Sequence, residues 1–111
     1  MKALAEASGV VARPPGEVFD RLRRLLNGGA YPMRMDVDRE RGFVAVQGGW
    51  WYRGEYRVTP DPVGARVEHR VVNAAAWGRW GVPLANRFFL GFRARTAAGF
   101  ARLLEELGTP G

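Results

Sequence analysis

The sequence predicts an α+β fold in which a curved antiparallel sheet of about five strands wraps around a long C-terminal helix. Short segments of alternating apolar and polar residues fill most of the chain between residues 33 and 73. Residues 84–107 carry a helical apolar stripe without internal proline, which corresponds to a helix roughly 36 Å long. A globule of 111 residues has a radius of gyration of only about 13 Å, so this helix must cross the domain. A curved sheet is the economical way to cover it.

The N-terminal region predicts a strand followed by a short helix. Residues 2–12 are mostly small and apolar, and the Pro-Pro dipeptide after them ends extended structure and can open a helix. In residues 15–26 the apolar side chains share one stripe, while Glu17 and Asp20 lie in the first turns, where the helix dipole favours negative charge. An Asn-Gly-Gly sequence then gives a strong stop signal. We expect this short helix to close one end of the sheet.

Four further strands follow, separated by turn residues. Gly48-Gly49 offers the two positive-φ positions of a tight hairpin, and a turn centred on Asp61-Pro62 joins the next two strands. The predicted strands span residues 33–38, 43–47, 50–58 and 65–73.

The two turns also predict a register and an inner face. Pairing across Gly48-Gly49 places Gln47 opposite Trp50, and the second turn places His69 opposite Gly54. The predicted concave face is apolar with a few polar points, a composition that suits an apolar ligand oriented by hydrogen bonds. Its apolar members are Met33, Met35, Val37, Phe43, Ala45, Trp50, Tyr56, Val67 and Val71, and its polar points are Gln47, Tyr52, His69 and Asn73.

The C-terminal part predicts a loop and then the long helix. Residues 74–83 are mostly small and include two tryptophans, whereas residues 84–107 follow the helical period until Gly108 ends it. No Pro/Gly-rich stretch is long enough to separate two domains, so we expect a single domain over residues 1–111.

Composition excludes several classes of chemistry. The chain has no cysteine and one histidine, so we expect neither disulfides nor a metal site, and thiol catalysis is excluded. It also lacks a phosphate-binding loop and a dinucleotide fingerprint, so we expect no cofactor. No secretory signal or membrane span is apparent, which favours the cytoplasm.

The net charge of +6 would attract polyanions and anionic lipid. The basic residues of both predicted helices are interspersed with acids, so we expect no specific nucleic-acid binding. Trp77 and Trp80 lie close in the sequence to Arg79 and Arg87, a mixture that suits either peripheral contact with an anionic membrane or a pocket lid, with packing as the competing interpretation.

The order of elements resembles the START-like (SRPBCC) superfamily, which includes polyketide cyclase/dehydratase and lipid-transport proteins. The resemblance rests on residues 10–19 (VVARPPGEVF), residues 51–58 (WYRGEYRV) and the final helix. It implies a helix-grip fold whose sheet and long helix enclose a pocket for a hydrophobic or amphipathic molecule. Members usually have more strands and an additional small helix, so this chain would be a shortened member with a small pocket or none. An edge strand at residues 33–38 would then be free to pair with a second copy.

His69 and the polar points of the concave face are the candidate site residues. His69 could act as a general base near neutral pH, with room beside it at Gly54, and the competing interpretation is a core histidine satisfied by a neighbour. Tyr52 and Tyr56 could hydrogen-bond a ligand carbonyl or phenol, or could simply pack. The predicted ligand-binding residues are Gln47, Trp50, Tyr52, Tyr56, Asn73, Phe88 and Phe92.

Three functions follow from these observations. The first is binding of a small hydrophobic molecule between the sheet and the C-terminal helix. The second is a cyclase- or dehydratase-like enzyme in which His69 moves a proton while Tyr52 or Gln47 orients a carbonyl. The third is a cavity-free interaction module that forms a homodimer through a sheet edge or meets a partner with its aromatic loop.

Overall fold

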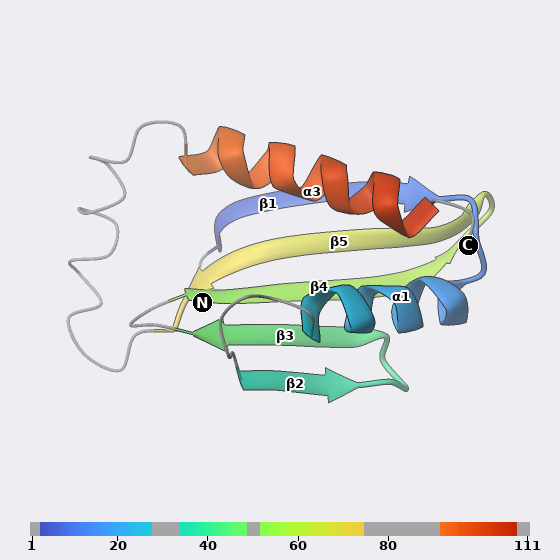
Figure 1. Cartoon of the computed structure of the whole chain (residues 1–111), viewed down its shortest axis with the longest axis horizontal. Coiled ribbons are helices and arrows are strands. Elements are labelled where there is room, and N and C mark those ends of the chain that lie inside the picture. The colour runs from blue at the N-terminus through green and yellow to red at the C-terminus, as the bar shows by residue number, and fades with distance from the viewer. Residues whose placement is uncertain (1–2, 28–33, 49–51, 75–91, 109–111) are drawn as a thin grey trace.

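A computed structural model describes residues 3–27, 34–48, 52–74 and 92–108. Within these residues the fold is α+β, with one five-stranded antiparallel sheet and two helices (Figure 1). The elements in chain order are β1 (Ala3–Val11), α1 (Pro15–Asn27), β2 (Arg34–Asp38), β3 (Phe43–Gly48), β4 (Tyr52–Asp61), β5 (Gly64–Asn73) and α3 (Phe92–Gly108).

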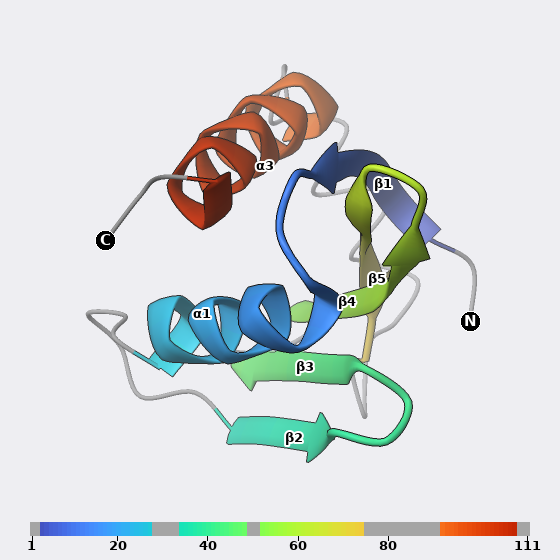
Figure 2. The same cartoon turned by 90° about the vertical axis from the view of Figure 1, so that its right-hand side faces the viewer.

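The sheet has the order β1-β5-β4-β3-β2, so the first strand pairs with the last. Three successive hairpins join β2 to β5, and β1 then adds antiparallel to β5. Seen end-on, the sheet curves from β1 to β2 and holds both helices on its concave side (Figure 2). The sheet is open, with β1 and β2 as its edges.

The predicted inner face of β4 and β5 is confirmed, although the strands pair two residues away from the predicted register. His69 lies opposite Tyr56 instead of Gly54, and Gly54 lies opposite Val71. An even shift leaves every side chain on its own face, because side chains alternate with a period of two. Tyr56, Val67 and Val71 are accordingly buried.

The predicted inner face of β3 is wrong. Gln47 pairs with Arg53 and not with Trp50, an odd shift that reverses the face. Val44 and Val46 therefore share the face of Tyr56, whereas the set Phe43, Ala45 and Gln47 lies on the outer face. The segment carries apolar residues at both parities, so alternation could not decide between them.

Both helices pack on the concave face, as the amphipathic patterns predict. In α1 the buried residues are Val18, Phe19 and Leu22, and the helix ends one residue beyond the predicted residue 26. The described part of the C-terminal helix begins at Phe92, so residues 84–91 of the predicted helix lie outside the described residues. One core cluster unites the sheet with both helices. Its members are Val11, Val18, Phe19, Leu22, Val44, Tyr56, Val58, Ala65, Val67, Phe100 and Leu107.

Helix α3 runs alongside β1, in the half of the sheet away from β2 (Figure 1). Gly9 allows this approach, because a Cβ at that position would collide with the side chain of Leu104. Two guanidinium groups contact the C-terminal end of α3. Arg13 Nε donates to the Gly108 carbonyl at 3.4 Å, and Arg21 donates to the Leu107 carbonyl at 3.4 Å. Cations at this end interact favourably with the helix dipole, and these contacts help to fix α3 over the sheet.

Neither helix of the described chain is both long and apolar enough to cross a membrane.

Candidate functional site

His69 lies at the middle of β5 on the concave face, within a stack of aromatic rings. Its imidazole is stacked on Tyr56 with 4.2 Å between ring centroids and an interplanar angle of 11°. Phe100 of α3 lies 5.7 Å from the imidazole at an angle of 14°. The histidine is only 6% exposed, so the strand pair and α3 hold its ring in one orientation. The sequence predicted an apolar helical stripe over residues 84–107, which include Phe100, but it did not identify this contact.

A backbone hydrogen bond selects the tautomer of His69. Its Nδ1 lies 3.2 Å from the carbonyl oxygen of Glu55, which can only accept, so Nδ1 carries the proton and donates it. The Nε2 atom therefore keeps its lone pair. Burial lowers the pKa of His69 below its usual value, and the hydrogen bond to Glu55 offsets only part of that effect. The ring is neutral at pH 7 and offers an acceptor.

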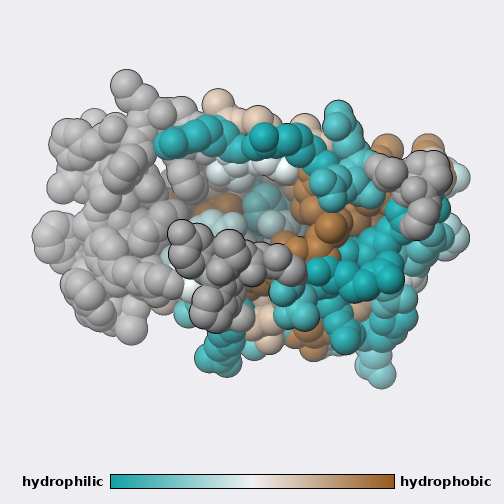
Figure 3. Space-filling model, viewed as in Figure 1, coloured by the Kyte–Doolittle hydropathy of each residue, from teal (hydrophilic) through white to brown (hydrophobic). Residues whose placement is uncertain are grey.

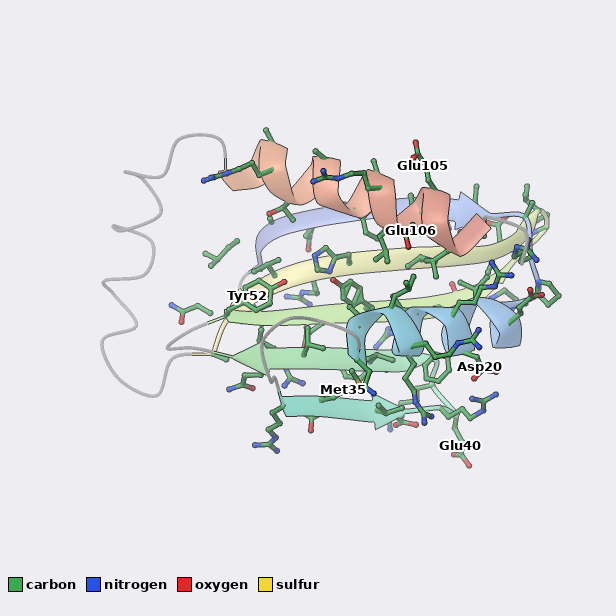
Figure 4. All side chains as sticks on the ribbon, viewed as in Figure 1. Asp20, Met35, Glu40, Tyr52, Glu105 and Glu106 are labelled. Carbon is green, nitrogen blue, oxygen red and sulfur yellow. The ribbon has the colours of Figure 1, made fainter. Side chains whose placement is uncertain are left out.

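The second polar group of the site is the hydroxyl of Tyr52, which lies over Gly54. A Cβ at position 54 would lie 2.8 Å from the Tyr52 hydroxyl and 3.4 Å from Cε1 of His69. The hydroxyl and the imidazole thus flank the place where a side chain of residue 54 would stand. Figure 4 shows the Tyr52 ring at the end of β4 with its oxygen directed toward the middle of the sheet. Burial raises the pKa of Tyr52, so the phenol is neutral at pH 7.

Tyr56 supports the site formed by Tyr52 and His69, because its ring stacks on the imidazole. It is 8% exposed and belongs to the core cluster. Burial, together with the nearby Tyr52, raises its pKa far above the ordinary value, which excludes a tyrosinate. The helix side of the molecule is hollowed between α3 and α1, and the floor of this hollow combines apolar and weakly polar surface (Figure 3).

The structure brings together some of the predicted ligand-binding residues and not others. Tyr52, Tyr56 and His69 share the concave face, and Asn73 is half-buried opposite Tyr52. Gln47 does not join them, because it lies on the outer face and accepts a hydrogen bond of 3.2 Å from Arg53. Trp50, Phe88 and the side chain of Phe92 lie outside the described residues.

A depression of about 410 Å³ lies across β1, β5, β4 and β3. It is bordered mainly by outer-face side chains, namely Glu6, Ser8, Phe43, Glu55, Arg57, Glu68 and Arg70. Opposite charges are neighbours there, since Glu6 pairs with Arg70 and Arg57 with Glu68 across the strands. The sequence pattern placed Phe43 on the inner face and did not predict the depression. Its charged, mutually compensated walls are unlike those of a pocket for an apolar ligand.

Among the residues that the structure describes, no group of three or more His, Cys, Asp or Glu side chains could hold a metal ion. Comparisons with protein-family models, with curated proteins and with solved structures find no match to this chain.

Proposed function

We propose that the protein binds a small, neutral, hydrophobic or amphipathic molecule against the concave face of the sheet, as a shortened START-like protein with a helix-grip arrangement. One observation carries the proposal. The hydroxyl of Tyr52 and the imidazole of His69 both approach the Cβ position of Gly54, on a face that is mostly apolar. A few fixed polar groups within an apolar surface are what orient a small ligand.

The charge state of these two groups defines the ligand class. Both are neutral at pH 7, because burial lowers the pKa of His69 and raises that of Tyr52. A charged ligand would lose its hydration here without gaining an opposite charge from either group. A neutral molecule with a hydroxyl or carbonyl group could instead hydrogen-bond at Gly54 and bury its apolar part against the sheet.

The proposal is tested with N-phenyl-1-naphthylamine, a neutral apolar fluorophore, titrated into the full chain. We expect saturable binding that Gly54→Ala weakens roughly tenfold, because the new methyl group must displace the Tyr52 hydroxyl or the ligand. Gly16→Ala is the matched control, since a Cβ at that position meets no atom within 4 Å. Equal affinity for both variants, or no saturable binding by the unaltered chain, would contradict the proposal.

A second candidate is acid/base catalysis at the same site. It is favoured by the fixed tautomer of His69, which leaves Nε2 unprotonated and able to accept a proton. His69→Gln separates the two functions for any molecule that the chain is found to convert. A binder retains affinity, whereas an enzyme loses turnover with its binding kept. The turnover of such an enzyme would rise with pH through the lowered pKa of His69.

A further inference from the structure

The outer edge of β2 is open in the part of the chain that the structure describes. β2 is the last strand of the sheet and pairs with β3 on one side, so its other side presents unpaired backbone N–H and C=O groups (Figures 1 and 2). Its exposed side chains lie at this edge, with Arg34 76% and Asp38 45% exposed at the side chain and Val37 43% exposed overall. A strand added here would extend the sheet.

We propose that this edge binds β2 of a second copy of the chain, antiparallel and centred on Asp36. The five-residue sequence Arg-Met-Asp-Val-Asp is self-complementary in that register. Arg34 of each copy lies opposite Asp38 of the other, and Met35 lies opposite Val37 of the other. A two-fold axis through the centre repeats each contact, so the pairing closes as a dimer and leaves no open end at β2.

The register places the two Asp36 carboxylates opposite each other, and each chain brings its own cations to this point. The side chain of Arg53, only 17% exposed, lies with its Nη1 3.0 Å from Asp36, and Arg34 Nε lies 3.5 Å from the same carboxylate. The hydrogen bond from Arg53 lowers the pKa of Asp36, which stays ionised and paired. Each chain thus places Arg34, Arg41 and Arg53 beside Asp36, Asp38 and Glu55, so the charges of these groups are balanced on the outer face.

The inner face of the junction is apolar. Met35 packs against the core cluster of its own chain, and Val37 is one of the few large apolar side chains that the described structure leaves exposed. Cross-strand pairing would cover Val37 with Met35 of the second copy. The overlap of five residues is short, so the dimer is expected to be weak and concentration-dependent.

The opposite edge of the sheet offers no comparable match. β1 (Ala3–Val11) carries Glu6 as its sole charged residue, so self-pairing would gain no ion pair to fix a register. Helix α3 also packs alongside it, with Leu104 against Gly9. Charge complementarity therefore favours β2 as the dimer edge.

The test is sedimentation velocity of the full chain over a concentration series, with variants that reverse one charge each. Arg34→Glu and Asp38→Arg each place like charges opposite one another twice per dimer. We expect each to weaken self-association about tenfold or more. Arg66→Glu on β5 is the control for Arg34→Glu, because it makes the same change in net charge away from β2 and should leave association unaltered.

Mixing the two variants gives the sharper result. An Arg34→Glu chain and an Asp38→Arg chain restore both ion pairs with each other, so we expect a heterodimer from two chains that are monomeric alone. Circular dichroism of each variant confirms that it is folded. A mixture that stays monomeric overturns the proposal, as does an unaltered chain that stays monomeric across the series or an Arg34→Glu chain that dimerises normally.

Discussion

The buried histidine makes the stability of this protein depend on pH in a range where few other groups titrate. Burial lowers the pKa of His69 in the folded state, so the unfolded chain binds a proton more readily. Full stability is therefore present above the unfolded pKa of about 6.5 and is lost as the pH falls below it. The loss continues until the folded histidine is protonated as well.

The size of the effect follows from one proton. Between the unfolded pKa and the lower folded pKa, the free energy of unfolding falls by up to about 1.4 kcal/mol per pH unit. Protonation would also place a cation between Tyr56 and Phe100, where the structure holds a neutral ring. The exposed carboxylates of Asp20 and Asp36 do not obscure this range, because their arginine partners hold their pKa values below 3.8.

Urea denaturation at a series of pH values from about 8 to about 5.5 measures this slope, with fluorescence and circular dichroism as two independent probes. His69→Gln is the comparison, because it cannot titrate. We expect a declining free energy of unfolding in the unaltered chain and a nearly flat one in the variant, whatever their absolute stabilities. A flat profile in the unaltered chain, or the same slope in both, would refute the assignment of a neutral buried histidine.

Three further variants test the packing that supports the site. Leu22→Ala removes a fully buried side chain and should cost about 2–5 kcal/mol in urea denaturation, whereas Leu25→Ala, at a residue 39% exposed on the same helix, should cost much less. Gly42→Ala should lower the thermal midpoint more than Gly16→Ala, because Gly42 has a φ of 63° and its Cβ would strike the Val58 carbonyl. Phe100→Leu should raise the pKa of the stacked histidine, followed by its ring-proton NMR shifts, since water gains access to the imidazole; an unchanged pKa would contradict its burial by α3.

The elements that the sequence predicted best are those whose alternation is unambiguous. From Tyr52 to Val58 uncharged and charged residues alternate at every position, so an error of two residues in register left the face of each side chain correct. In β3 the sequence Phe-Val-Ala-Val is apolar at both parities, and the face was then decided by the assumed turn at Gly48-Gly49 alone. The strand instead ends at Gly48 and the next begins at Tyr52, so the face of Gln47 was wrong.

The geometry of the candidate site was likewise predicted only as far as the pattern within each strand allowed. The proximity of His69 and Gly54 was predicted from a register in which they face each other, whereas they are diagonal neighbours on adjacent strands. Diagonal neighbours are still within reach of a long or aromatic side chain, which is why the error had little effect. The stacking of Phe100 depends on the path of α3 over the sheet, and no local pattern in the sequence specifies that path.

The position of the Tyr52 ring over Gly54 can be explained by the stability of the sheet or by ligand binding. A glycine inside a strand weakens it, and an aromatic ring lying over the glycine recovers part of the loss, so the position of Tyr52 serves the sheet itself. A phenylalanine would serve that purpose equally well, and a valine at position 54 would make the ring unnecessary. Tyr52 and His69 together add a hydroxyl beside an imidazole. The carbonyl of Glu55, the residue after Gly54 in β4, fixes the tautomer of this imidazole. Burying a polar group costs free energy that a hydrogen bond offsets, and the Nδ1 of His69 has such a bond to the carbonyl of Glu55. Under the proposed function, the Tyr52 hydroxyl and the Nε2 of His69 would in addition orient a ligand.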